Sequence, residues 1–275
     1  MKGSQMIKLT DLIELAGVQL NNFKIHCATG ENPTPMEAFY DGKFREWQER
    51  QNNKNFECKQ ILSLIHDNGS AWLFAGVYEV LGVAPGTWKP SKCFMYSTRE
   101  LKGLDHLVGR AIVAFDKKFR ASYLNGEKYA DLLHVSAILD QRKTIGPFPG
   151  FNNVLLTHTM LRTVIREMDA SWFTALSKLG GIYLITDTSD GKLYVGSAYG
   201  DEGIWQRWAS YANTGHGNNK ELRALLKEKG QEHANFFQFK LLEICDINSS
   251  KNQIFDREIH WKEVLKSREF GLNRN

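Results

Sequence analysis

Two tyrosines in the last hundred residues have the types and spacing of groups that could assist phosphodiester hydrolysis. Tyr183 and Tyr194 stand in two apolar runs on either side of the turn signal Asp190-Gly191. Hydrolysis needs a nucleophilic water, charge stabilisation at the phosphate and a route out for the leaving oxygen. A phenol, with an ordinary pKa of about 10, acts as a base only if nearby positive charge lowers that pKa. These two tyrosines alone leave open the alternative that they simply fill one face of a hairpin.

An arginine and a third tyrosine follow at helical spacing. Arg207 and Tyr211 are four residues apart, so a helix places both side chains on one face. The planar guanidinium is always charged and can bridge two phosphate oxygens, which suits it to a scissile phosphate. An arginine on a solvated helix face is the alternative.

A glutamate lies within an apolar stripe near the end of the chain. Ile254, Trp261 and Leu265 share one face of an expected helix, and Glu258 falls between the first two. A carboxylate there costs free energy unless it is paired or bound to a cation. A structural ion pair with Arg or Lys and a metal site are equally good explanations at this point.

The elements that position these residues follow the order β-β-α-α-β-α. Gly and Asp-Gly signals bound the strands, and helical periodicity with a closing glycine bounds the helices. We expect a three-stranded antiparallel sheet, with strands at 181–187, 193–197 and 236–244 and helices at about 203–213, 218–229 and 252–267.

This segment resembles the GIY-YIG nuclease family over roughly residues 180–275. Gly-Ile-Tyr at 181–183 and Tyr-Val-Gly at 194–196 match the two family tripeptides, with Val195 in place of Ile. Tyr211 stands where some relatives have His and others Tyr. The resemblance implies that Arg207 binds the phosphate, that Glu258 binds Mg²⁺ or Mn²⁺, and that late Asn273 orders the site. It thus implies a catalytic set of Tyr183, Tyr194, Arg207, Tyr211, Glu258 and Asn273.

Several polar residues near this set could contact nucleic acid. Lys192 in the hairpin turn could lower a tyrosine pKa, although a solvated turn lysine is the plainer interpretation. The loop Thr214–Lys220 precedes a helix, where Asn218 or Asn219 can cap and loop donors can touch a phosphate backbone. We include His216, Asn218 and Lys220 as candidate nucleic-acid contacts.

The amino-terminal part carries no such motif. Helical patterns cover about 8–17 and 35–66, and strand-like runs cover 72–81, 93–96, 107–115 and 133–139. Together they predict a curved sheet or barrel with helices at its ends, faintly similar to PUA-like modules, a class that includes readers of modified bases. Trp88 and Arg99 lie in an aromatic and basic neighbourhood that would suit base stacking and backbone contacts. Ordinary core aromatics and solvated charges are the alternative.

Composition agrees with a two-domain α+β protein. The chain has 275 residues, 42% hydrophobic and 24% charged, which is globular rather than disordered. We expect a target-recognition domain at 1–170 and a nuclease domain at 171–275. Four cysteines without C-x-x-C spacing suggest neither a zinc cage nor a disulfide framework, and reduced thiols together with no long apolar run favour a cytoplasmic protein without a membrane segment. The net charge of +4 permits a polyanionic partner without requiring one.

The expected function is a metal-dependent DNA endonuclease that restricts foreign DNA, including base-modified DNA. The alternatives are a non-catalytic nucleic-acid reader on a nuclease scaffold and a structure-specific repair, recombination or mobile-element nuclease. RNA and branched DNA stay open as substrates, because these side chains do not read the sugar. Double-strand cleavage would need a homodimer or two successive nicks.

Overall fold

Two hydrophobic cores form along the chain, one in each of two units. The computed structural model describes residues 6–88, 91–200, 202–245 and 249–274. It divides into a first unit, Met1–Thr144, and a second unit, Ile145–Asn275. The segment 145–170, expected in the first domain, belongs to the second unit. There, strand β9 (Leu155–Thr157) pairs with β12 (Phe237–Cys245), and helix α5 (His158–Glu167) packs against α7 (Gly203–Thr214).

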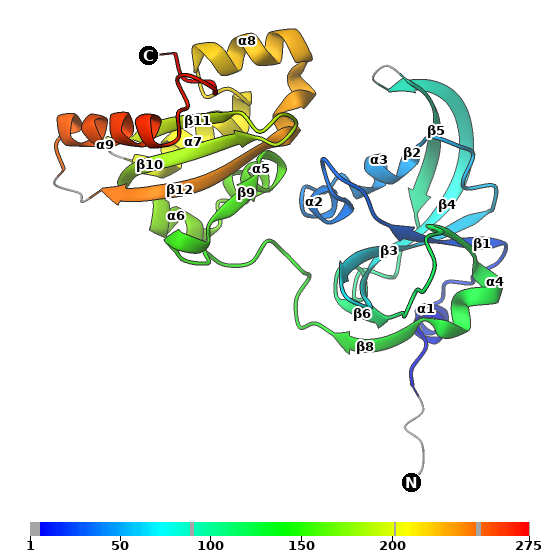
Figure 1. Ribbon diagram of the computed structural model, residues 1–275. Coiled ribbons are helices and arrows are strands. Elements are labelled where there is room, and N and C mark those ends of the chain that lie inside the picture. Colours follow the sequence, from blue (N-terminus) through cyan, green and yellow to red (C-terminus); the bar gives the residue numbers. More distant parts are fainter. Residues whose placement is uncertain (1–5, 89–90, 201, 246–248, 275) are drawn as a thin grey trace. The chain divides into compact units, whose positions relative to one another are not determined.

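The first unit is built on a mixed eight-stranded sheet. The main strand order is β2-β5-β4-β3-β1-β7, with β6 pairing to β4 and β8; β1 and β3 are parallel, and the other pairs are antiparallel. Strands β4 and β5 form a long curved ribbon (Figure 1). The elements are α1 (Leu9–Leu15), β1 (Phe23–Ala28), α2 (Pro35–Tyr40), α3 (Phe44–Glu49), β2 (Arg50–Gln51), β3 (Gln60–Asn68), β4 (Ala71–Trp88), β5 (Ser91–Glu100), β6 (Ala111–Ala114), β7 (Tyr123–Asn125), α4 (Gly126–Tyr129), η1 (Ala130–Leu132) and β8 (His134–Ile138).

The expected helix over 35–66 is wrong beyond residue 49. Two short helices, α2 and α3, occupy its first part, and β3 takes Gln60–Asn68. Five consecutive residues of β3, from Ile61 to Ile65, are buried, because the strand lies inside the sheet and is covered on both faces. A short apolar run of this kind has no alternation, so periodicity does not distinguish it from a buried helix.

The second unit has a four-stranded antiparallel sheet in the order β11-β10-β12-β9, one strand more than expected. The additional strand, β9, lies directly before helix α5. That helix begins after Thr157, whose side chain accepts a hydrogen bond from the Met160 backbone N–H. The other elements are η2 (Phe151–Asn153), α6 (Ala170–Leu176), β10 (Gly180–Asp187), β11 (Leu193–Ala198), α8 (Lys220–Lys229), η3 (Gln231–Phe236) and α9 (Lys251–Val264).

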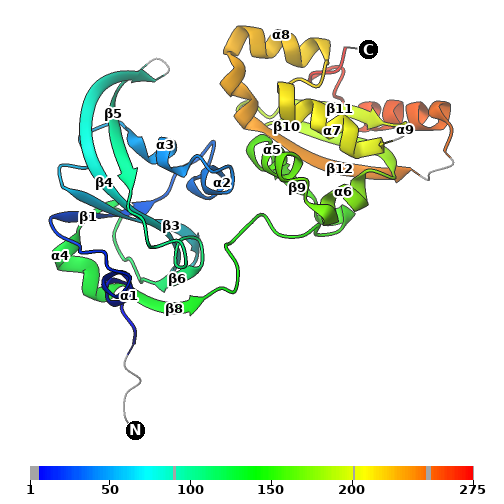
Figure 2. The same cartoon turned by 180° about the vertical axis from the view of Figure 1, so that it is seen from behind.

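Helices cover both faces of the second sheet. Helices α5 and α7 pack on one face, and α9 packs on the other against β10 and β11 (Figures 1 and 2). Alternation along β11 therefore sends Tyr194 and Ala198 into the larger core under α7, and Val195 into the smaller core under α9. Because β11 is the edge strand, residues on its two faces can meet around that edge.

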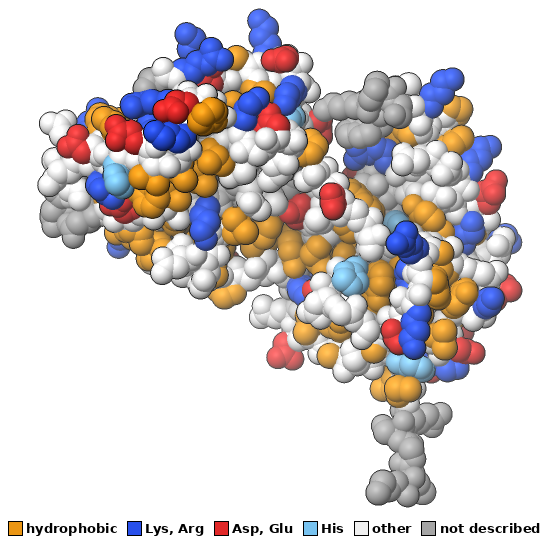
Figure 3. All heavy atoms as spheres, in the orientation of Figure 1, with side chains coloured by type: hydrophobic (Ala, Val, Ile, Leu, Met, Phe, Trp, Pro, Cys, Tyr) orange, Lys and Arg blue, Asp and Glu red, His pale blue; other side chains and the backbone are white. Residues whose placement is uncertain are grey.

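The surface carries charges of both signs. On the face shown in Figure 3, Lys and Arg side chains alternate with Asp and Glu over the helices of the second unit. All four cysteines are free thiols. Within the described ranges, no helix has the length and apolar character needed to cross a bilayer.

Candidate active site

The β10–β11 hairpin places two tyrosines on the same face of the sheet. Tyr183 pairs with Gly196, and Ile185 pairs with Tyr194, so both phenols face α7. Gly196 leaves the space that the Tyr183 ring occupies. A Cβ at position 196 would lie 2.5 Å from Tyr183 Cζ, which is far inside van der Waals contact. The glycine of the second tripeptide is thus required by the tyrosine of the first.

We expect Gly196→Ala to displace the Tyr183 ring. The added methyl group overpacks a fully buried position, so the free energy of unfolding should fall by about 1–3 kcal/mol. The shift of the urea midpoint measures this loss. Gly82→Ala is the matched control, because a Cβ there meets nothing within 4 Å. Equal stability of the Gly196→Ala and Gly82→Ala proteins would contradict the steric argument.

Arg207 is the centre of a buried hydrogen-bond network. Its Nε donates to the Tyr183 hydroxyl at 2.9 Å and its Nη2 to the Tyr211 hydroxyl at 3.1 Å. The two hydroxyls lie 3.0 Å apart and share a hydrogen bond. Its Nη1 donates to the Gly217 carbonyl at 2.7 Å. A guanidinium has five N–H donors, so these three bonds leave two free to bind an anion.

The two phenols beside Arg207 are protonated at neutral pH. Burial raises the pKa of Tyr183 above its ordinary range, and Tyr194 raises it further, although Arg207 opposes the shift. Burial also raises the pKa of Tyr211. The positive charge expected to lower a tyrosine pKa is therefore present, but desolvation has the larger effect on the pKa of Tyr183. Both hydroxyls hold the guanidinium in one orientation.

The loop before α8 supports Arg207 through its backbone. Positive φ angles at Gly215, Gly217 and Asn218 fold the loop back over α7, where the Gly217 carbonyl accepts from Arg207. His216 accepts from the Asn218 backbone N–H through Nδ1 at 3.1 Å, and burial lowers its pKa. The capping residue of α8 is Asn219, which accepts from the Leu222 N–H, and Lys220 is exposed.

Glu258 approaches the edge of β11 from α9, on the opposite side from Arg207. The Ser197 hydroxyl donates to Glu258 Oε2, and the Lys262 ammonium lies 2.7 Å from Glu258 Oε1. The Glu258 side chain is 16% exposed and that of Lys262 is 5% exposed. A buried lysine one helical turn away thus offsets the charge of the glutamate. Both explanations offered by the sequence, the ion pair and the cation site, are compatible with this geometry.

Glu258 and Ser197 fit one divalent cation held mainly by water. Across the parts of the chain that the structure describes, no three His, Cys, Asp or Glu side chains gather into a metal cage. Mg²⁺ is often bound through one or two carboxylates and several waters, so a lone carboxylate at an open pocket suits it. The Lys262 ammonium contacts one carboxylate oxygen, and the other oxygen is directed to Ser197.

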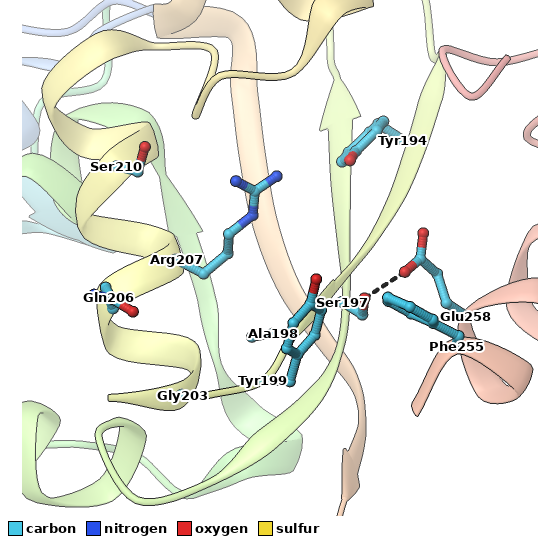
Figure 4. A pocket seen from close by; sticks show the side chains of 10 residues that line it. All are labelled: Tyr194, Ser197, Ala198, Tyr199, Gly203, Gln206, Arg207, Ser210, Phe255 and Glu258. Atoms are coloured by element: carbon cyan, nitrogen blue, oxygen red, sulfur yellow. Dashed lines mark hydrogen bonds between the residues drawn. The ribbon is translucent and has the colours of Figure 1, made fainter. Parts of the chain in front are cut away.

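A pocket of about 510 Å³ joins these groups at the edge of the sheet. Arg207 lies on one side of β11 and Glu258 on the other, with Tyr194 above them (Figure 4). Tyr183 and Tyr211 do not line the pocket and stand behind Arg207. The pocket is therefore lined by oxygen atoms that can bind a cation, by the free N–H donors of Arg207 and by the phenol of Tyr194. That arrangement can bind a phosphodiester and polarise it.

Asn273 is held in the strand edge and is not frayed. Its side chain accepts from the Val195 N–H and donates to the Val195 carbonyl, both at 2.8 Å. Only 1% of Asn273 is exposed. The Leu272 N–H also donates to the Leu193 carbonyl. This segment occupies the free hydrogen-bonding edge of β11 between Tyr194 and Gly196, and so fixes the strand from which Tyr194 projects.

The remaining candidates lie outside this pocket. Lys192 pairs with Asp190 at 3.0 Å in the turn. Arg99 forms an ion pair with Glu79 on neighbouring strands of the first unit. Trp88 ends β4, and its side chain lies outside the described part of the structure.

The residues that contact the predicted set include Ser197, Gly217 and Lys262, which the sequence alone did not single out. Lys262 carried a usable signal, because it is four residues after Glu258 on the same helix. Ser197 follows the second tripeptide directly, and strand alternation places it on the α9 face. Gly217 acts through its backbone carbonyl, and since every residue has one, the residue type gives no signal for this contact.

Comparison with known proteins shows which protein family the second unit matches. The family model of the GIY-YIG catalytic domain matches residues 179–273. Among solved structures, the chain is similar to a mutant form of the catalytic domain of intron endonuclease I-TevI. The two are 30% identical, the match covers 35% of this chain and 94% of the other, and the TM-score is 0.28. No curated protein matches the chain.

Proposed function

Because the chain belongs to the GIY-YIG endonuclease family through residues 179–273, we propose that it hydrolyses DNA in a reaction that depends on a divalent metal. The observation that carries this proposal is the pocket at the edge of β11, which Arg207 and Glu258 line from opposite sides. A phosphodiester in that space would contact the two free guanidinium N–H groups. Glu258 and water would hold Mg²⁺ or Mn²⁺ beside it.

Each residue of the set has a proposed role. Arg207 binds the scissile phosphate, with Tyr211 and Gly217 fixing its orientation. Tyr183 lies behind Arg207 and keeps its proton, so it orients the guanidinium through its hydroxyl and does not reach the attacking water. Tyr194, the phenol at the pocket wall, is the group placed to take the proton of that water, and Asn273 holds β11 in place. When bound, the metal polarises the phosphate and stabilises the leaving oxygen.

The first unit is proposed to select the target DNA. One pocket of this unit, about 440 Å³ in volume, is lined by several amide side chains together with Arg50, Trp47 and Tyr123. Among the amides, Gln51 Oε1 accepts from Asn55 Nδ2 and from the Tyr123 hydroxyl. Fixed amide donors and acceptors beside aromatic rings suit the reading of base edges. The similarity of this unit to PUA-like modules stays a prediction, as do the contacts proposed for Trp88, Arg99, Lys192, His216, Asn218 and Lys220.

Restriction of foreign DNA is the proposed biological role. A nuclease site combined with a separate unit for target selection supports it. Repair, recombination and mobile-element spread use the same chemistry, and the choice among them depends on what the first unit reads. A homodimer is one proposed route to double-strand cleavage, since one site holds one scissile phosphate.

Cleavage of plasmid DNA and of phage DNA with modified bases tests this proposal. With Mg²⁺ we expect the full chain to convert supercoiled plasmid to open or linear forms, and with excess EDTA we expect no conversion. A difference between unmodified and modified DNA would show what the first unit reads.

Two outcomes would contradict the proposal. Cleavage that persists in EDTA would exclude metal dependence. Binding of DNA without cleavage in Mg²⁺ or Mn²⁺ would favour a nucleic-acid reader on a nuclease scaffold. RNA and branched DNA are then the substrates to compare.

A further inference from the structure

The catalytic pocket has an aromatic end that the proposed chemistry does not use. Tyr199 directly follows β11, and Phe255 precedes Glu258 by three residues on α9, so both side chains line the pocket. Their rings meet edge to face, with centroids 5.3 Å apart. The Lys251 ammonium lies 4.9 Å from the Tyr199 centroid and 5.3 Å from the Phe255 centroid. Figure 4 shows the Tyr199 hydroxyl pointing into the space between Arg207 and Glu258.

The aromatic side chains at this end of the pocket are accessible to solvent, as in a binding surface, and are not packed into the hydrophobic core. Tyr199 is 43% exposed, whereas Tyr183, Tyr194 and Tyr211 of the same unit are buried. Phe255 is only partly buried and Lys251 is exposed. An accessible aromatic ring with a cation beside it is the combination that binds unpaired nucleotides, because every nucleobase presents a flat face and every nucleotide carries a phosphate.

We propose that Tyr199 and Phe255 stack on the nucleobase next to the scissile phosphate, and that Lys251 contacts an adjoining phosphate. This inference rests on the proposed function, which places the scissile phosphate between Arg207 and Glu258. Bases in a duplex are stacked on their neighbours, so the base that reaches Tyr199 must first leave the stack. That step is least costly where the base is mismatched or unpaired. The nuclease should therefore cut faster beside such a base than in a uniform duplex.

The test uses a duplex oligonucleotide that spans a mapped cleavage position. An abasic nucleotide replaces the residue on each side of the cut in turn, and Tyr199→Leu is compared with the wild type. On the intact duplex we expect Tyr199→Leu to raise KM by about 5- to 100-fold, with a larger share of the effect on KM than on kcat. On one of the abasic duplexes the wild type should lose the same factor, and the substitution should add nothing.

Two further variants separate the ring from other effects. Tyr199→Phe keeps the stacking face and should recover most of the affinity. Phe270→Leu removes an aromatic side chain of the same unit that is 77% exposed and lies outside the pocket, and it serves as the control. If Tyr199→Phe were as damaging as Tyr199→Leu, the hydroxyl and not the ring would be responsible, and the stacking proposal would be wrong.

Failure of this inference is distinguishable from failure of the proposed function. Metal-dependent cleavage by the wild type, with an unchanged KM in Tyr199→Leu, would overturn the stacking subsite alone. If the wild type cut no DNA, binding of a fluorescent oligothymidylate, measured by anisotropy, would decide. Equal affinities for the wild type and Tyr199→Leu would then overturn the subsite, and weaker binding by Tyr199→Leu would support it.

Discussion

Replacement of Arg207 by alanine should lower the single-turnover cleavage rate by at least about 10³-fold. The guanidinium supplies the only cation among the described pocket-lining residues, and two of its N–H groups are free for a phosphate. The protein should still fold, because the Tyr183 and Tyr211 hydroxyls remain hydrogen-bonded to each other. Near-ultraviolet circular dichroism checks that the buried aromatic residues keep their packing.

Arg207→Lys tests whether charge alone is sufficient. An ammonium group has three donors and no planar fork, so it cannot serve two phenols, the Gly217 carbonyl and a phosphate together. We expect a loss of about 10²-fold or more. Arg166→Ala is the matched control, since Arg166 forms an exposed ion pair with Glu167 on α5. A cleavage rate for Arg207→Lys within a few-fold of the wild type would contradict a bidentate role for the guanidinium.

Glu258→Gln should lower the single-turnover cleavage rate by at least about 10³-fold, as Arg207→Ala does, because it removes the carboxylate that would hold the metal. The amide keeps the shape of the side chain, so the contact with Ser197 can persist while the charge is lost. Titration with Mn²⁺, followed by electron paramagnetic resonance, should show binding to the wild type that is absent in Glu258→Gln. Glu263→Gln, an exposed change on the same helix, is the control.

The same carboxylate also contributes to the fold. Lys262 is almost fully buried, and Glu258 offsets its charge from one helical turn away. Glu258→Ala should lower the free energy of unfolding by about 1–3 kcal/mol, because it removes one partner of a partly buried pair. Lys262→Met in the Glu258→Ala background should restore part of that stability without restoring cleavage. Restored cleavage in the double variant would show that Glu258 is a structural residue only.

The sequence was most informative where function restricts residue type and spacing. The two tripeptides fixed the strand pair, and the four-residue step from Arg207 to Tyr211 fixed one helix face. It was least informative about β3 and β9. Strand β3 is buried on both faces and therefore lacks alternation, and β9 has three residues before a capped helix. Their strand identity comes from partners distant in sequence, which local propensity does not encode.

The residue types alone also did not predict the direction in which the pKa of Tyr183 is shifted. A tyrosine beside an arginine suggests a lowered pKa, but burial is the larger effect for Tyr183 and raises it. Burial depends on how α7 closes over the hairpin, which is a property of the whole unit. The Gly217 carbonyl and the Asn273 side chain likewise act on partners that only the folded chain brings near.

The position of β11 at the edge of its sheet has a consequence for changes in chain length. Tyr194 projects toward α7, whereas Ser197, three residues later, projects toward α9. Because side chains alternate along a strand, residues an odd number of positions apart lie on opposite faces, and β11 thus contributes to both sides of the pocket. Substitutions along β11 alter one side at a time. Insertion or deletion of a single residue between these two positions would send one of them to the wrong face. Natural variants of this hairpin should therefore differ in composition far more often than in the number of residues between Tyr194 and Ser197.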